Sequence, residues 1–192
     1  LKTLPGVLAV HKDAPVQALL TESVPLIGAP AVWAMTDGAG HGVTGAGITV
    51  AVIDTGIDYT HPDLGGGIGP GRKIIGGYDF SSNDNDPMDE HGHGTHCAGI
   101  VAANGVLKGV APGASLLAVK VLDAEGYGYQ SEVIAGIEWA ANPDGNPATD
   151  DAADVISISL GGEGNPDDAM CQAVDEAVRQ GVVAVIAAGN SA

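Results

Sequence analysis

Basic residues are scarce in this chain. Its 192 residues include 7 Lys and Arg against 24 Asp and Glu, and the formal net charge is −17 at pH 7. Proteins that bind nucleic acids place Lys and Arg against the phosphates, and this sequence has no basic surface that could do so. We therefore expect no nucleic-acid partner, and a soluble, self-repelling surface of the kind common in secreted proteins.

Long apolar runs and cysteines are also few. No apolar run reaches the roughly 20 residues of a membrane-spanning helix, so we expect no membrane segment in this chain. The two cysteines, Cys97 and Cys171, are too few for a disulfide framework. Because the chain starts at Leu1 rather than Met and stops at Ala192, we expect it to be a piece of a longer protein.

Apolar stretches alternate with helical patterns through most of the chain. These stretches are continuously apolar, which is typical of strands buried on both faces of a parallel sheet. Repeated strand–helix–strand units with right-handed crossovers predict a doubly wound, mostly parallel α/β sheet with helices on both faces. The predicted strands are 48–57, 115–122, 154–160 and 182–188, and the predicted helices are 93–103, 131–142 and 166–180.

Asp54 and His93 are candidates for acid–base chemistry. Asp54 closes a predicted strand, at the sheet edge where reacting groups gather in α/β proteins. His93 starts a predicted helix. Hydrolysis of an amide needs a base that takes a proton from the nucleophile and returns it to the leaving nitrogen. An imidazole does this well when a carboxylate orients it.

The motifs around these residues resemble those of the subtilisin-like serine peptidases (peptidase family S8). The matching segments are Asp-Thr-Gly-Ile-Asp at 54–58, His-Gly-Thr-His at 93–96 and Ala-Ala-Gly-Asn at 187–190. The resemblance implies that Asp54 orients His93, that His93 is the general base and acid, and that the Asn190 amide donates to the oxyanion. For subtilisin itself, loss of that donor is known to cost about 10²–10³ in kcat.

The nucleophile of this family has no counterpart in the sequence. No serine stands in the Gly-Thr-Ser-Met-Ala setting that carries it. The order Asp, His and a later Ser is that of subtilisin, so we expect the serine outside residues 1–192 and the chain to be inactive alone. A truncated chain that binds peptides without cleaving them is the alternative.

The resemblance also divides the chain. Residues 1–22 resemble the tail of an inhibitory propeptide, and residues 23–192 resemble the amino-terminal part of the catalytic domain. An ordinary edge strand and linker is the alternative for the first thirty residues. The expected protein is a secreted zymogen whose partners are protein or peptide substrates and its own propeptide.

Two glycine-containing segments resemble the substrate-binding strands of the family. An extended peptide pairs with such strands through backbone N–H and C=O groups, and glycine allows a close approach. The resemblance therefore implies that a substrate lies between the two segments. The candidate substrate-binding residues are Gly126, Tyr127 and Gly128 in one segment, and Ser159, Leu160 and Gly161 in the other.

Two other kinds of hydrolase have to be weighed against this interpretation. His91, His93 and His96 have the spacing of a zinc-dependent hydrolase, although Thr95 stands where that signature has Asp. The peptidase resemblance instead makes His96 a packed structural residue and His91 an exposed loop residue. Ser191 could belong to the nucleophile turn of an α/β-hydrolase, but there the acid and base follow the serine.

The last expectations concern cofactors and Cys97. The predicted chemistry needs no cofactor, while a structural calcium ion stays open. Asp63 matches a carboxylate that often binds calcium in the family, but the loop at 104–108 is shorter than the usual calcium loop. The acidic turn at 83–86 lacks a full ligand pattern and is expected to be solvated. Cys97 is either a small core residue or a reactive thiol near the catalytic histidine.

Overall fold

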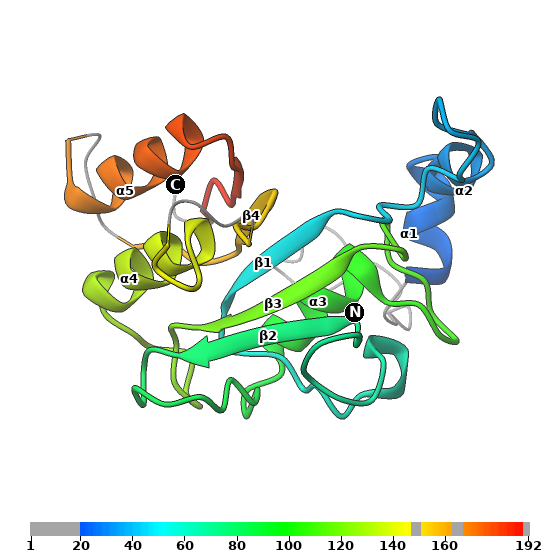
Figure 1. Ribbon diagram of the computed structural model, residues 1–192. Coiled ribbons are helices and arrows are strands. Elements are labelled where there is room, and N and C mark those ends of the chain that lie inside the picture. The colour runs from blue at the N-terminus through cyan, green and yellow to red at the C-terminus, as the bar shows by residue number, and fades with distance from the viewer. Residues whose placement is uncertain (1–19, 147–150, 163–166, 190–192) are drawn as a thin grey trace, which may run out of the picture.

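One parallel sheet with helices on both faces forms the body of the molecule (Figure 1). The computed structural model describes residues 20–146, 151–162 and 167–189. Within these residues the strand order is β2-β3-β1-β4-β5, and no helix is long and apolar enough to span a membrane. The strands are β1 Thr49–Asp54, β2 Ile74–Asp79, β3 Ser115–Lys120, β4 Val155–Ile158 and β5 Val183–Ile186. The helices are α1 Leu20–Leu26, α2 Ala29–Trp33, the 3-10 helix η1 Pro62–Leu64, α3 His93–Ala102, α4 Gln130–Ala141 and α5 Ala169–Arg179.

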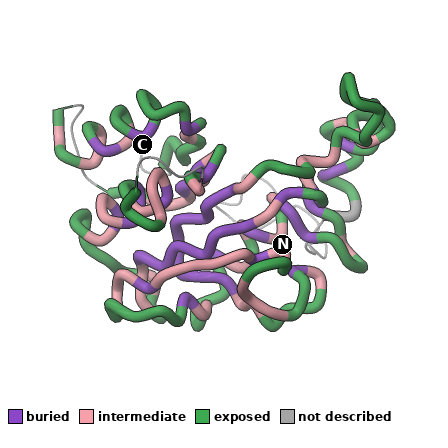
Figure 2. Tube along the Cα trace, in the orientation of Figure 1, coloured by how far each residue is buried: buried purple, intermediate pink, exposed green. Residues whose placement is uncertain are grey.

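β1 lies at the centre of the sheet because both of its faces can be buried. Residues 50–54 are all buried, as the purple stretch through the middle of Figure 2 shows. β1 pairs in parallel with β3, where Asp54 lies opposite Lys120, and with β4, where Ile53 lies opposite Ile158. A continuous apolar stretch predicts this kind of strand, and the prediction is confirmed.

Alternate residues of β1 face helices on opposite sides of the sheet. Val52 packs in one cluster with Ala98 of α3. Ile53 packs in a second cluster with Ile137 of α4 and Ala177 of α5. The predicted doubly wound α/β sheet with helices on both faces is therefore confirmed.

The sequence does not predict β2. Gly76 and Gly77 interrupt its apolar pattern, and glycine inside a strand weakens the strand signal. The structure gives a reason for Gly77, because a Cβ at this position would collide with the carbonyl oxygen of Ala118 and with the ring of Pro87. β2 thus pairs with β3 through a close approach that a larger residue would prevent.

The structure also shortens the predicted strands at their ends, moves a helix boundary and adds helices that the sequence does not predict. The helix predicted from residue 166 begins at Ala169, because the side chain of Asp168 caps it by accepting a hydrogen bond from the Cys171 N–H at 2.9 Å. The segment 20–33, for which the sequence predicts no helix, forms α1 and α2, and Pro30 fits the first turn of α2. Residues 1–19, most of the segment that resembles a propeptide tail, lie outside the described residues.

β5 forms an exposed edge of the sheet. The exposed fractions of Val183, Val185 and Ile186 are 57%, 55% and 49%. Within the part of the chain that the structure describes, its backbone pairs with β4 on one side and with no strand on the other. An apolar strand with one unpaired edge is a surface on which another chain segment can add.

Candidate active site

A cleft of about 500 Å³ opens where β1, β3 and β4 end. In α/β sheets, ligands bind at this carboxyl edge of the strands. The segments that follow these strands line the cleft, together with the start of α3. The lining residues are Thr55, His91, His93, Leu122, Glu125, Gly126, Tyr127, Gly128, Tyr129, Gln130, Val133, Ser159, Leu160, Gly161, Gly162 and Met170.

Asp54 and His93 form a hydrogen-bonded pair at the base of this cleft. Asp54 Oδ1 lies 2.7 Å from His93 Nδ1, and it also accepts the N–H of Thr55 at 2.8 Å. The Asp54 side chain is fully buried, whereas the His93 side chain is 44% exposed. Since an ionised carboxylate only accepts hydrogen bonds, it favours the tautomer with the proton on Nδ1 and leaves Nε2 as an acceptor.

The start of α3 lies very close to the turn that follows β1. A Cβ on Gly94 would collide with the carbonyl oxygen of Gly56, so only glycine fits there. The Gly94 N–H donates to the hydroxyl oxygen of Thr55 at 2.9 Å. His93 and Asp54 therefore meet because their neighbours in sequence are in direct contact.

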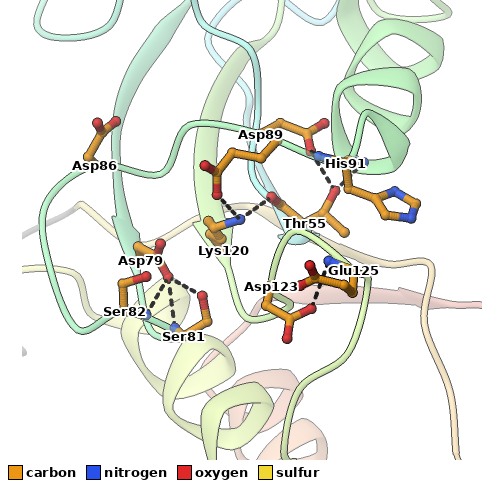
Figure 3. Close-up of polar contacts among 12 residues, drawn as sticks. Thr55, Asp79, Ser81, Ser82, Asp86, Asp89, His91, Lys120, Asp123 and Glu125 are labelled. Atoms are coloured by element: carbon orange, nitrogen blue, oxygen red, sulfur yellow. Dashed lines mark hydrogen bonds and ion pairs between the residues drawn. The ribbon is translucent and has the colours of Figure 1, made fainter.

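Both predicted substrate-binding segments line the same cleft as His93. The segment after β3 is held in a tight turn by Asp123, which accepts the N–H of Glu125 at 3.0 Å (Figure 3). Asp123 also accepts the N–H of Tyr127 at 2.9 Å. Gly128 lies so close to the carbonyl oxygen of Val121 that a Cβ would collide with it. The three residues predicted after β4, namely Ser159, Leu160 and Gly161, complete the set.

Three histidines lie near the start of α3, but they do not converge. The rings of His91 and His93 are 6.3 Å apart between centroids and meet edge to face. His96 is exposed and lines a separate hollow, so the prediction that it packs inside the protein is wrong. Among the described residues, the metal-ligating atoms that cluster belong to Asp54, His93 and Cys97. The geometry therefore gives no support to a zinc site built from the three histidines.

Cys97 lies one helical turn after His93. Its Sγ is 3.9 Å from His93 Nδ1, and the side chain also packs against the apolar cluster on the α3 face of the sheet. Burial raises the pKa of the Cys97 thiol, and the negative charge of Asp54 raises it further. A raised pKa lowers the thiolate fraction, which favours a packing residue over a reactive thiol.

The predicted oxyanion donor cannot be placed. Asn190 lies outside the described residues, as does Ser191. The last described residue, Gly189, follows β5 with a positive φ of 83°. The role of Asn190 therefore stays a prediction.

The carboxylate of Asp63 is already engaged by backbone groups. It accepts the N–H groups of Val106 at 3.0 Å and Leu107 at 3.1 Å. The hydrogen bond from Leu107, followed by that from Val106, holds the pKa of Asp63 below its ordinary value. The short loop thus satisfies Asp63 with N–H donors and brings no second carboxylate to it. This geometry does not fit a calcium site at Asp63, and a structural calcium ion elsewhere stays a prediction.

The acidic turn at 83–86 is exposed. Asp84 Oδ1 accepts the N–H of Asp86 at 2.9 Å, and Asp86 Oδ1 accepts the hydroxyl of Tyr59 at 2.8 Å. The hydroxyl of Tyr78 also donates to Asn83 Oδ1 at 3.1 Å. The turn thus lies on the surface with its side chains bonded to neighbouring groups, and the expectation that it holds no calcium ion stays a prediction.

Lys120 is a buried residue of the site that the sequence does not single out. It is 2% exposed, its Nζ donates to the carbonyl oxygen of Thr55 at 3.0 Å, and Glu90 lies 4.0 Å away (Figure 3). The bond to Thr55 holds the backbone directly after Asp54. The only sequence signal is a lysine at the end of an otherwise apolar strand.

Comparison with known proteins identifies the family. The sequence model of the subtilase family matches residues 45–192. The chain belongs to the subtilase family. A subtilase fold also agrees with the structure, because a crystal structure of a cold-adapted subtilisin-like serine proteinase superposes with a TM-score of 0.64 at 38% identity. That match covers 77% of this chain and 48% of the proteinase.

Two curated subtilases show how much of a relative this chain represents. It is 45% identical over 194 residues to the minor extracellular protease Vpr of Bacillus subtilis, covering 96% of this chain and 22% of Vpr. It is 44% identical over 179 residues to the major intracellular serine protease of the same species, covering 89% of this chain and 50% of that protein. The chain thus spans half or less of each of these relatives.

Proposed function

We propose that this chain supplies the acid, the base and much of the substrate cleft of a subtilisin-like serine endopeptidase. The observation that carries the proposal is the 2.7 Å contact between Asp54 Oδ1 and His93 Nδ1 in the cleft lined by both glycine-containing segments. Membership of the subtilase family supports it. The nucleophilic serine lies outside residues 1–192, so the chain is inactive alone.

In this mechanism His93 takes and returns a proton while Asp54 orients it. Asp54 holds His93 with the proton on Nδ1, which leaves Nε2 to accept the proton of the serine hydroxyl as that oxygen attacks the peptide carbonyl. The imidazolium, stabilised by the buried carboxylate, then protonates the leaving nitrogen. Asn190 donates its amide to the oxyanion that forms on the carbonyl oxygen. The acyl group is then bonded to the serine oxygen. A water molecule, deprotonated by His93 in the same way, attacks it and releases it, and the serine oxygen regains its proton.

The substrate of this reaction is an extended segment of a protein. Backbone groups of the segments 126–128 and 159–161 pair with it as neighbouring strands do, and their glycines allow the close approach. Asp123 supports this role because it fixes the turn before Gly128 by accepting two N–H groups.

The decisive test compares variants of the full-length protein. Asp54→Asn places an amide donor against Nδ1 and favours the wrong tautomer, so kcat should fall about 10⁴-fold, the loss known for the same change in a serine protease triad. His93→Ala should abolish hydrolysis. Asp86→Asn, an equal change of charge in an exposed turn, should leave kcat unchanged. Activity that survives both active-site changes would exclude the triad.

A second test concerns the chain as it stands. The absence of a serine in the nucleophile motif favours a peptide-binding chain that does not cleave. Incubation of residues 1–192 with an unfolded protein should give no cleavage. Robust cleavage that His93→Ala removes would contradict the placement of the serine outside the chain. Hydrolysis that a chelator stops and zinc restores would revive the metal mechanism.

We also propose that the protein is a secreted zymogen and that residues 1–22 are the tail of its propeptide. The high negative charge supports secretion, as does the name of the extracellular relative, although the other relative is called intracellular. Amino-terminal sequencing of mature protein from the culture medium should give a start near residue 23. A mature start far from this position would overturn the assignment.

A further inference from the structure

The helix that carries His93 has no cap of its own. Its N-cap residue is Gly92, which has a φ of 97° and no side chain that could accept a hydrogen bond. The first N–H groups of a helix lack partners inside the helix. The Gly94 and Thr95 N–H groups, which directly follow His93, therefore depend on acceptors from elsewhere in the fold.

Two side chains outside the helix, one of them distant in sequence, supply these acceptors. Thr55 Oγ1, 39 residues away, accepts the Gly94 N–H at 2.9 Å. Asp89 Oδ2 accepts the Thr95 N–H at 2.8 Å. The two caps are joined, because the Thr55 hydroxyl donates to Asp89 Oδ1 at 2.9 Å. The residue that follows Asp54 is thus connected to the helix start through one carboxylate.

Asp89 holds the chain on both sides of His93. Before His93, its Oδ1 accepts the N–H groups of His91 at 3.0 Å and Gly92 at 2.8 Å. After His93, its Oδ2 accepts both the N–H and, at 2.5 Å, the hydroxyl of Thr95. Figure 3 shows Asp89 between the turn after β1 and His91, with dashed lines to its partners.

The carboxylate of Asp89 suits this role only when it is ionised. Partial burial raises the pKa of Asp89, but the hydrogen bonds from Thr95, Gly92 and Thr55 outweigh burial and bring the pKa below its ordinary value. All five hydrogen bonds to Asp89 are donated by the partner group. An asparagine could not replace it, because its NH2 group would face an N–H or O–H donor.

We propose that Asp89 is a positioning residue for the peptidase reaction, which links Thr55 beside Asp54 to both sides of His93 and thereby fixes the contact between the acid and the base. This inference rests on the proposed function. Asp89 touches neither the substrate nor the reacting atoms, and it acts through the backbone that carries His93. A shift of about 1 Å in a catalytic group can cost on the order of 10² in rate.

The test uses the full-length protein and a short peptide substrate. Asp89→Asn should lower kcat about 10–100-fold with KM within about twofold, because the loss falls on the geometry of the base and not on substrate binding. The low-field proton resonance of His93 Nδ1–H should shift or broaden. Asp86→Asn removes an equal charge from the neighbouring exposed turn and should match the wild type in both measurements.

A second test uses Thr55, where valine has nearly the same shape as threonine but no hydroxyl. Thr55→Val removes the hydroxyl that joins Gly94 to Asp89, whereas Thr55→Ser keeps it. We expect Thr55→Val to lower kcat as Asp89→Asn does, and Thr55→Ser to restore most of it. Because both residues belong to one link, the double variant Thr55→Val/Asp89→Asn should lose little more than the worse single variant.

The outcomes separate this inference from the function on which it rests. A wild-type protein without peptidase activity, or one that His93→Ala leaves active, overturns the proposed function. With that function intact, wild-type kcat and an unshifted His93 resonance in Asp89→Asn and Thr55→Val overturn the inference. Independent, fully additive losses in the double variant overturn it as well, since separate structural defects add.

Discussion

At the scale of single residues, the sequence predicts the acid–base pair better than it predicts the residues that hold the pair in place. Asp54 and His93 are named by local motifs, and the structure brings their side chains to 2.7 Å. Asp89 has no such motif, because one of its partners, Thr55, is 34 residues away and most of the others are backbone groups. Because every residue except proline has a backbone N–H, the sequence does not show which of these groups bond to Asp89. The exposure of His96 was mispredicted for a related reason, since the side of α3 that faces the sheet depends on packing.

The low pKa of Asp89 has a consequence for stability. A carboxylate whose folded pKa lies below the unfolded value of about 3.9 stabilises the fold fully above that pH, and this contribution is lost as the pH falls through the folded pKa. Asp89→Asn should therefore lower the free energy of unfolding at pH 7 by about 1–3 kcal/mol, the cost of donors left unpaired. Below about pH 4 the gap to the wild type should narrow. Urea unfolding at several pH values measures it, and a gap independent of pH would contradict the assignment.

At the scale of elements, the hydrophobic pattern predicts four strands and three helices. It does not predict the strand β2, and the close contact of Gly77 with β3 explains why. β1, β3, β4 and β5 are mostly apolar, so their type follows from composition. β2 carries two adjacent glycines, and the close contact that requires glycine at one of them, Gly77, is visible only beside β3. Sequence patterns predict strands from the preferences of their own side chains. Gly77 is instead required because the neighbouring strand β3 leaves no room for a Cβ.

Two glycines offer a matched test of this point. Gly77→Ala should destabilise the protein by about 1–3 kcal/mol, because the new methyl group meets the backbone of β3 and the ring of Pro87. Gly99→Ala in α3 has open space around the new Cβ, and should stabilise by about 0.5–1 kcal/mol through helix propensity. Thermal unfolding of both variants checks the prediction. Equal shifts in the two would show that the contact at Gly77 is not limiting.

At the scale of the whole molecule, charge and the exposed edge act in opposite directions. The net charge of −17 keeps molecules apart, while the apolar edge strand β5 favours pairing between them. Membership of the family predicts the fold. The balance between charge repulsion and pairing through β5 depends instead on the particular charges and strands of this chain.

The balance should depend on ionic strength. Raising the salt concentration shortens the Debye length from about 30 Å at 0.01 M to about 3 Å at 1 M, so self-association of residues 1–192 should increase with salt. Val185→Lys places a charge on the exposed strand and should reduce it. Light scattering across a salt series measures both effects. Association that falls with salt, or that Val185→Lys leaves unchanged, would exclude β5 as the contact.

The short sequence distance between Asp54 and His93 has a consequence for the order of events during folding. The two residues are 39 apart in the sequence, so a loop of about 39 residues closes their contact, and Lys120 of β3 also holds the backbone after Asp54. The entropic cost of closing a loop rises slowly with its length, and the serine of the proposed mechanism, expected outside residues 1–192, would close a longer one. The acid and the base can therefore meet before the longer loop to the proposed serine closes, and a chain at that stage would hold an oriented base with no nucleophile beside it.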